Sequence, residues 1–154
     1  MRLSLPVALQ PYLKKYLAYH YSVEPFILTE KNRHGAFLIN SLRHKSKVEP
    51  EGRGMNYRYL TTKVDIELSE FYWRNFGNVI PLKCQYRFNN FLLDEFQEKM
   101  VEFVQPRLER KGDLNMRLLT FREKFSISED ELPIKTMQKA WEREKNRITI
   151  YKSA

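Results

Sequence analysis

The chain has 154 residues, of which 42% are hydrophobic and 30% charged, and its formal net charge at pH 7 is +8. This length fits one domain, or one domain with a small appendage, and a core of that size needs no disulfide or metal. The composition argues against a disordered chain, the single cysteine excludes an internal disulfide, and no apolar run approaches the roughly 18 residues of a membrane span. With no apolar signal region at the start either, we expect a non-secreted, cytoplasmic protein.

Basic charge is concentrated at the two ends of the chain. Residues 1–56 contain nine Lys/Arg and four Asp/Glu, residues 57–110 contain eight of each, and residues 111–154 contain ten and seven. The formal net charges are therefore +5, zero and +3. A localised basic excess favours a polyanionic partner through counterion release, whereas the alternative is that the charge serves solubility alone. The localisation favours nucleic acid.

The first 44 residues predict two helices and a short strand. Pro11 suits the first position of a helix, and apolar residues recur at helical spacing as far as Tyr21. The run PFILTE, residues 25–30, is extended. Asn32 is a suitable N-cap for a second helix, although Gly35 weakens that prediction. Its expected inward residues are Leu38, Ile39 and Leu42.

The clearest strand is predicted within residues 57–68, where apolar and polar residues alternate. It follows an exposed loop, residues 45–56, that is rich in charge, Gly and Pro. A lone strand is unstable, so we expect pairing with the extended run near Phe26 to Thr29. The prediction is an α+β fold, with a small antiparallel sheet covered by helices and a helical C-terminal half.

Two helices are predicted between the strand and residue 112. Ser69 and Gly77 bound a short one, and a long one begins near Leu82, is bent or ended by Pro106 and stops by Gly112. The inward side of the long helix is expected to hold Phe88, Leu92, Phe96, Met100, Phe103 and Val104. We expect an α+β core over residues 1–112 and a C-terminal helix pair over residues 113–154, together forming one compact unit.

Residues 113–147 predict a helix-turn-helix arrangement. Asp113 is a suitable cap for the first helix, Ser128 and Glu131 have the spacing of a capping box, and Pro133 fits the first turn of a new helix. Polar side chains outside the apolar stripe of the second helix are of the types that contact bases or phosphates in the major groove. These candidate DNA contacts are Lys135, Gln138, Lys139, Arg143, Asn146 and Arg147.

Two features of this helix pair favour an alternative. The turn is longer than the usual three or four residues and lacks a glycine, and Glu142 and Glu144 interleave with the bases as on a solvated helix. In that alternative the second helix docks through Trp141, and aromatic helix faces bind a protein partner. The sequence leaves DNA binding and a protein interaction or assembly function both open.

The segments LLTFREKFSISEDELPIKTMQKAWERE and LPVALQPYLKKYLAYHY resemble small uncharacterised proteins of phage and conjugative elements. Those proteins look like they begin with a PPYLKQ-like helix and end with a YGISEDDI-like helix pair. The resemblance spans both ends of the chain and implies a mobile-element origin and DNA binding. Phe125-Ser126-Ile127 replaces the aromatic-Gly-Ile of that pattern, and Trp141-Glu142-Arg143 replaces its aromatic run, so the turn geometry departs from it. No catalytic residues are implied.

The basic loop supplies a second set of candidate contacts. Lys45, Lys47 and Arg53 are placed to reach a DNA backbone. Tyr57 and Tyr59 adjoin this loop, and bases interleaved with aromatics bind single strands in other proteins. The simpler expectation is that these tyrosines pack on the polar face of the strand.

No constellation of catalytic or metal-ligating residues converges. His34 and His44 are ten residues apart, which does not place them on one helix face, and Cys84 has no neighbouring His or Asp. We therefore expect no enzyme activity, no metal and no cofactor. The predicted function is that of a non-enzymatic accessory or regulatory protein of a mobile element that binds double-stranded DNA, without a membrane partner. A homo-oligomer and a weaker single-strand or RNA-binding interpretation remain open.

Overall fold

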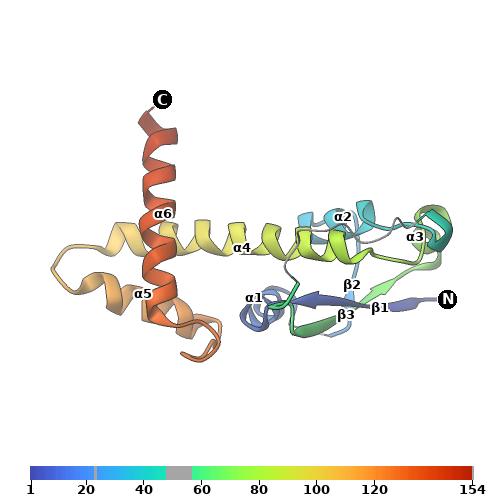
Figure 1. The fold of residues 1–154 in the computed structure, drawn as a ribbon, viewed down its shortest axis with the longest axis horizontal. Helices are drawn as coiled ribbons and strands as arrows, with labels where there is room; N and C mark the ends of the chain where they lie inside the picture. The colour runs from blue at the N-terminus through green and yellow to red at the C-terminus, as the bar shows by residue number, and fades with distance from the viewer. Residues whose placement is uncertain (23, 48–56, 154) are drawn as a thin grey trace. The chain divides into compact units, whose positions relative to one another are not determined.

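The protein has an α+β fold, as the sequence predicted (Figure 1). The computed structural model describes residues 1–22, 24–47 and 57–153, with the side chains of Lys47 and residues 148–153 left aside. In these residues no helix combines the length and apolar character needed to cross a bilayer. The elements, in order, are β1 Leu3–Leu9, α1 Pro11–Tyr21, β2 Phe26–Ile27, α2 Arg33–Asn40, η1 Lys45–Lys47, β3 Thr62–Leu68, α3 Glu70–Phe76, α4 Leu82–Val104, η2 Gln105–Arg107, α5 Asp113–Lys124 and α6 Ile134–Ser153.

The sheet has three strands in the order β1-β3-β2 and is mixed. β1 pairs antiparallel with β3, from Leu3 opposite Leu68 to Leu9 opposite Thr62, whereas β2 pairs parallel with β3. The predicted pairing of β2 with the central strand is confirmed, but the expectation of a wholly antiparallel sheet is wrong. A parallel pair requires a crossover connection, and the chain from β2 through α2 supplies it.

Side chains of α4 cover the outer edge of β1. The Gln85 side chain accepts a hydrogen bond from the backbone N–H of Ala8 (2.8 Å), and the fully buried Asn89 accepts one from the N–H of Gln10 (2.9 Å). Asn89 also donates to the side chain of Gln10 (2.9 Å). These bonds satisfy edge groups that would otherwise invite another strand, and they fix the first part of α4 against the sheet.

The second helix forms as predicted, and its glycine has a packing reason. Asn32 caps α2 by accepting a hydrogen bond from the N–H of Gly35 (2.6 Å). A Cβ atom at Gly35 would lie 2.2 Å from the carbonyl oxygen of Thr29, so a larger residue would push the helix off the chain that precedes it. Leu38, Ile39 and Leu42 are buried, as expected.

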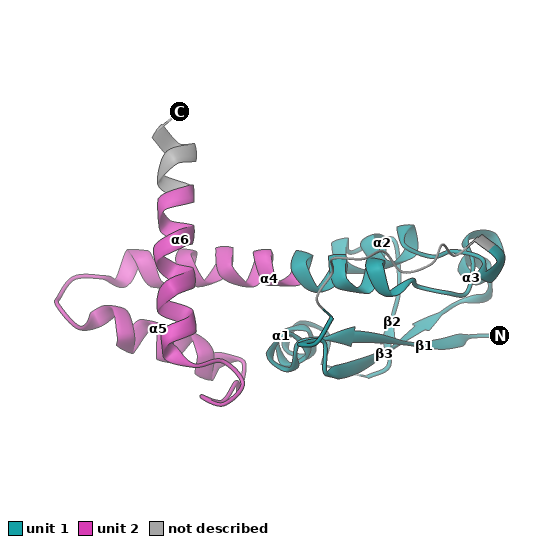
Figure 2. Cartoon of the chain, viewed as in Figure 1, with its two compact units in different colours: residues 1–91 teal, residues 92–154 magenta. Residues whose placement is uncertain are grey.

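The chain divides into two compact units, residues 1–91 and residues 92–154, and the division falls within α4 (Figure 2). The sequence had placed a division at residue 112, between η2 and α5. The second half of α4 groups with α5 because their aromatic rings meet: Phe96 lies 5.1 Å from Phe121 and 5.8 Å from Phe125, centroid to centroid. Phe96 is 2% exposed, in agreement with its predicted place in the core.

The formal charge is divided unequally between the two units. The first unit has fourteen Lys/Arg and seven Asp/Glu, a net charge of +7, and the second has thirteen and twelve, a net charge of +1. The basic excess that the sequence placed at both ends of the chain therefore belongs mainly to the first unit.

The second unit is built from three helical segments. α4 ends at Val104 and continues as the 3-10 turn η2 through Pro106, so the helix stops well before Gly112. The residue flanking the start of α5 is Gly112, with a φ of +90°, and not Asp113 as predicted. The carboxylate of Asp113 instead accepts the N–H groups of Glu109 (3.0 Å) and Arg110 (2.7 Å), which closes the turn and lowers the pKa of Asp113. α5 then runs back beside α4, and α6 lies across both (Figure 2).

Candidate nucleic-acid interface

The connection from α5 to α6 begins with a Schellman turn. Ser126 has a φ of +58°, in the left-handed region, and its N–H donates to the carbonyl of Glu123 (2.9 Å). The N–H of the next residue, Ile127, donates to the carbonyl of Arg122 (3.3 Å), and the Ile127 side chain is buried. This pattern ends helices and usually places glycine at the left-handed position. Ser126 therefore occupies the left-handed position that favours glycine.

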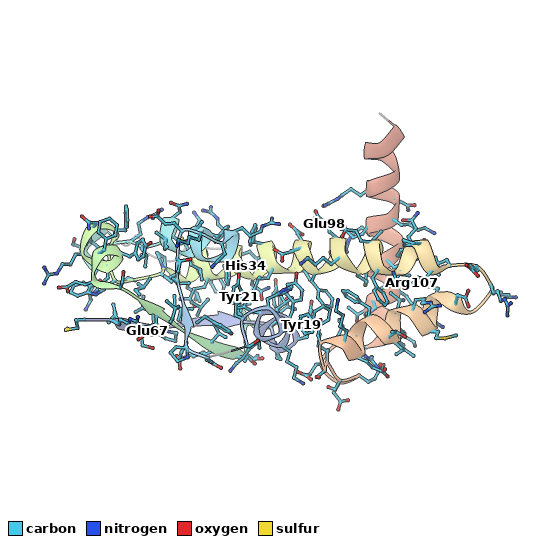
Figure 3. The ribbon with its side chains drawn as sticks, turned by 180° about the vertical axis from the view of Figure 1, so that it is seen from behind. Tyr19, Tyr21, His34, Glu67, Glu98 and Arg107 are labelled. Atoms are coloured by element: carbon cyan, nitrogen blue, oxygen red, sulfur yellow. The ribbon has the colours of Figure 1, made fainter. Side chains whose placement is uncertain are left out.

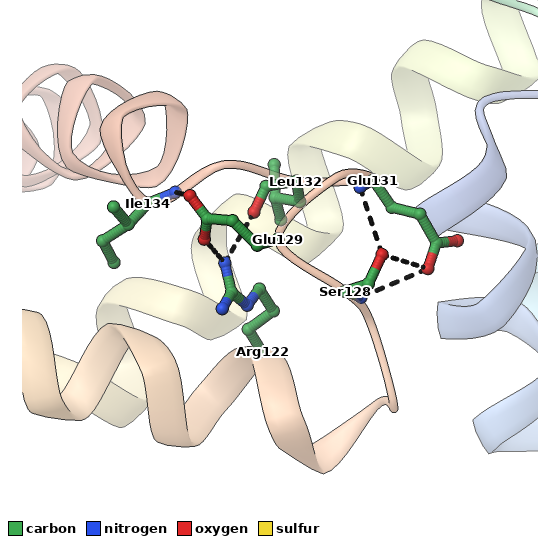
Figure 4. Close-up of polar contacts among 6 residues, drawn as sticks. All are labelled: Arg122, Ser128, Glu129, Glu131, Leu132 and Ile134. Carbon is green, nitrogen blue, oxygen red and sulfur yellow. Dashed lines mark hydrogen bonds and ion pairs between the residues drawn. The ribbon is translucent and has the colours of Figure 1, made fainter.

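The same connection contains the predicted capping box (Figure 4). The N–H of Ser128 donates to the Glu131 carboxylate (3.2 Å), and the N–H of Glu131 donates to the Ser128 hydroxyl oxygen (3.3 Å). The N–H of Leu132 donates to the carbonyl of Ser128 (3.0 Å), which completes one helical turn before Pro133. The nine-residue connection between α5 and α6 therefore has a defined, hydrogen-bonded conformation.

Glu129 joins the two helices across this turn (Figure 4). Its carboxylate pairs with the guanidinium of Arg122 on α5 and accepts the N–H of Ile134, the first residue of α6 (3.2 Å). Arg122 also donates to the carbonyl of Leu132 (3.0 Å). The hydrogen bond from Arg122 and that from Ile134 lower the pKa of Glu129, so the carboxylate is charged where it meets the N-terminus of α6.

The inner face of α6 is buried and includes a carboxylate. Met137, Ala140 and Trp141 are at most 7% exposed, as their predicted stripe required. Glu144 is also buried, at 4%, so its prediction as a solvated charge is wrong. Its oxygens lie 3.9 Å from Arg143 Nε and 3.5 Å from Arg147 Nε. The two arginines compensate a charge that would otherwise be costly to bury.

Arg143 and Arg147 also reach across to α4. Arg143 Nη2 donates to the Gln97 side chain at 3.5 Å, and Arg147 Nη2 pairs with the Glu98 carboxylate at 3.3 Å. Figure 3 shows where Glu98 lies on α4. Both arginines remain substantially exposed, with side-chain exposures of 65% and 45%. They therefore combine a structural role in the second unit with a solvent-accessible cationic group.

The outer face of α6 is an open surface. A shallow hollow is bordered by Lys135, Gln138, Lys139, Glu142, Arg143 and Asn146. Gln138 is half-buried and donates to Asn115 of α5 (2.5 Å), which fixes its position. Within the described part of the chain, Lys135 and Lys139 make no ion pair, so both charges are available to an anion. The predicted outward orientation of these side chains is confirmed, and the face offers two free amines, amide groups and a guanidinium.

The basic loop is described only at its start. Lys45 is exposed and begins η1, whereas the side chain of Lys47 and all of Arg53 lie outside the described residues. These residues belong to the first unit, and the α6 residues belong to the second. Their predicted contribution to DNA binding stays a prediction.

His20 and His34 pack together in the first unit. The Tyr21 hydroxyl and His34 Nδ1 form a hydrogen bond between α1 and the start of α2 (Figure 3), and His34 is 8% exposed. The rings of His20 and His34 lie 6.4 Å apart. Within residues 1–22, 24–47 and 57–153, no group of three His, Cys, Asp or Glu side chains is placed to hold a metal ion. His34 is a packed, hydrogen-bonded residue of the first unit.

Two aromatic surfaces of the structure were not predicted from the sequence. Tyr57 and Tyr59 precede β3 and meet Tyr86 of α4, so the expectation that they pack on the strand is wrong. On α3, no residue is buried, and Phe71 and Phe76 are 62% and 42% exposed. Helical or strand periodicity cannot reveal the first surface, since Tyr86 is 27 residues from Tyr59. The all-aromatic composition of EFYWRNF was the available signal for the second.

Comparison of the chain with protein-family models, with curated proteins and with solved structures found no match.

Proposed function

We propose that the protein binds double-stranded DNA through the outer face of α6, as a non-enzymatic accessory or regulatory protein. The observation that supports this proposal is that α6 has an exposed polar face on one side and is held in the core by its opposite side. Lys135, Gln138, Lys139, Arg143 and Asn146 share that face, while Met137 and Trp141 hold the opposite side in the core. A helix presented in this way after a turn is the arrangement that enters a major groove.

The roles of the individual residues follow from their chemistry. Lys135 and Lys139 would contact phosphate or guanine, and Asn146 and Gln138 carry the amide groups that pair with adenine. Gln138 is oriented by Asn115, and Arg143 by Gln97, so neither side chain needs to be ordered on binding. Glu142 lies among them, and its carboxylate would repel a DNA phosphate placed next to it. This repulsion would restrict the positions that the DNA backbone can take on the face.

The charge of the second unit sets the expected salt dependence. Its net charge is only +1, so general electrostatic attraction to DNA is weak and binding rests on the few cations of the face. With Lys135, Lys139 and Arg143 each neutralising one phosphate, log affinity should fall with log salt at a slope of about −3. A mobile-element origin, which the resemblance of both chain ends implies, belongs to the same proposal.

The test is duplex binding by the full chain, measured by fluorescence anisotropy over a salt series. Lys135→Ala with Lys139→Ala should reduce affinity and make the slope shallower by about two. The matched control, Lys99→Ala with Lys111→Ala, removes the same charge from α4 and from the turn before α5, and should leave the slope nearly unchanged. Equal effects of the two double variants, or no duplex binding at low salt, would contradict the proposal.

A second candidate function, protein interaction, is favoured by α3. The aromatic faces that the sequence suggested for this role are core, since Phe96, Phe121 and Trp141 are at most 3% exposed. On α3, Phe71 and Phe76 are exposed, and their ring centroids lie 6.4 Å apart. If this surface joins two copies, Phe71→Ser should lower the molecular mass measured by light scattering. An unchanged mass for wild type and variant at all concentrations would exclude self-association through α3.

A further inference from the structure

Three tyrosines from separate parts of the chain meet on the surface of the first unit. Tyr57 and Tyr59 belong to a turn closed by a hydrogen bond from the Leu60 N–H to the Tyr57 carbonyl (3.0 Å). Tyr86 comes from the first half of α4. Its ring centroid lies 5.8 Å from that of Tyr57, with the planes at 81°, and its hydroxyl hydrogen-bonds Tyr59. We call Tyr57, Tyr59 and Tyr86 the tyrosine cluster.

Hydrogen bonds hold the tyrosine cluster in place. The Tyr86 hydroxyl interacts with Asn90, one helical turn further along α4, and with Tyr59. These bonds lower the pKa of Tyr86, whereas the bond to Tyr86 and partial burial raise the pKa of Tyr59. The rings are thus oriented in advance, while Tyr59 remains 37% exposed.

The surroundings of the cluster are basic. Lys83 and Arg87 are exposed and lie three residues before and one residue after Tyr86 on α4, and Arg58 stands between the other two tyrosines. Residues 57–64 and 82–91, which contain the three tyrosines and these basic residues, contain no Asp or Glu. The first unit as a whole has a net charge of +7. This surface therefore combines aromatic rings with the exposed cationic side chains of Arg58, Lys83 and Arg87.

We propose that the tyrosine cluster, with Lys83, Arg87 and Arg58, is a binding surface for single-stranded nucleic acid. Unpaired bases stack on aromatic rings, and the basic side chains contact the phosphates between them. A duplex keeps its bases stacked inside and cannot use the rings, so this surface selects single strands. Every residue of the site lies in the first unit, so the inference stands independently of the duplex-binding role of α6.

Stacking can be separated from hydrogen bonding by variants at one position. Tyr59→Leu removes the ring and should weaken binding of a labelled dT12 or U12 oligonucleotide by about 5- to 150-fold, the effect of losing one stacked base. Tyr59→Phe keeps the ring and should stay within about threefold of wild type. The control Phe71→Leu removes a more exposed ring of the same unit and should have no effect. Thermal melting verifies that each variant is folded.

Two further arms complete the experiment. Lys83→Ala with Arg87→Ala should make the salt slope shallower by about 1.4, which is the value for two lost contacts to a single strand. Lys135→Ala with Lys139→Ala should leave oligonucleotide binding unchanged, which separates this site from α6. The relative affinity for dT12 and U12 identifies DNA or RNA as the ligand. The proposal is overturned if neither oligonucleotide binds, if Tyr59→Leu and Phe71→Leu have equal effects, or if a duplex of equal length competes as well as a single strand.

Discussion

Replacing Ser126 by glycine should stabilise the protein. Ser126 has a φ of +58°, and a non-glycine residue in that region costs roughly 1–2 kcal/mol. Glycine removes this cost but adds freedom to the unfolded chain, which offsets roughly 0.5–1 kcal/mol. The expected net gain in the free energy of unfolding is about 0.5–1 kcal/mol. The gain would come from the turn that positions α6, without touching its outer face.

Urea unfolding followed by far-ultraviolet circular dichroism measures this gain as a higher midpoint at an unchanged slope. Ser126→Ala is the first control, because it removes the hydroxyl and keeps Cβ, and it should not stabilise. Ser128→Ala is the second, because it breaks the capping box and should cost about 0.5–2 kcal/mol. A neutral or destabilising Ser126→Gly variant would refute the left-handed geometry assigned to this turn.

Three other predictions test packing and charge in the second unit. Phe96→Ala should lower the free energy of unfolding by about 3–5 kcal/mol, because Phe96 is buried against Phe121. The control Phe71→Ala on α3 should change the free energy of unfolding by less than about 0.5 kcal/mol. Similar melting shifts for the two variants would show that the Phe96 face is exposed. Glu129 has a pKa lowered from 4.5, so its stabilisation is present above that pH and is lost as the pH falls through the lower folded value. Acid titration of stability should therefore be flatter for Glu129→Gln, and a wild-type slope in that variant would contradict the bridge to Arg122. Arg143→Ala with Arg147→Ala leaves the Glu144 carboxylate buried without a cation. This double variant should lower the free energy of unfolding by about 1–2 kcal/mol, a value reduced because both arginines are exposed. Adding Glu144→Leu should restore part of the lost stability, and a triple variant less stable than the double variant would contradict the pairing of Glu144 with the arginines.

Most helices of this fold were predictable because their signals are local. Pro11, Asn32, Gly77 and the Ser128–Glu131 pair each act within a few residues, and each stands where the structure begins or ends an element. The outward face of α6 was predictable for the same reason, since helical periodicity alone separates Lys135 and Lys139 from Met137 and Trp141.

The first strand was missed although its apolar residues alternate from Leu3 to Leu9. Pro6 argues against a strand, but the N–H of Ala8, two residues on, points away from β3 to Gln85. Pro6 shares that orientation, so its missing N–H costs no ladder hydrogen bond. Whether Pro6 is tolerated in β1 therefore depends on which side of β1 pairs with β3, and the local sequence does not give that information.

The remaining misses involve partners far along the chain. The sequence suggested a solvated Glu144, because its burial depends on packing against distant segments of the second unit. Its partner Arg143, for example, contacts Gln97, which lies 46 residues away along the chain. The tyrosine cluster needs Tyr86 beside Tyr59. Charge and periodicity describe one segment at a time, so contacts of this kind become visible only in three dimensions.

The central claim, that the outer face of α6 contacts duplex DNA, is tested most directly by mapping the contact in solution. An ¹⁵N-labelled full-length sample is titrated with an unlabelled duplex of about 16 base pairs at low salt, and amide shift changes are recorded. We expect the largest changes at Lys135, Lys139, Arg143 and Asn146, and no changes at Tyr59 and Phe71. Changes confined to the first unit, or no changes at saturating duplex, would contradict it.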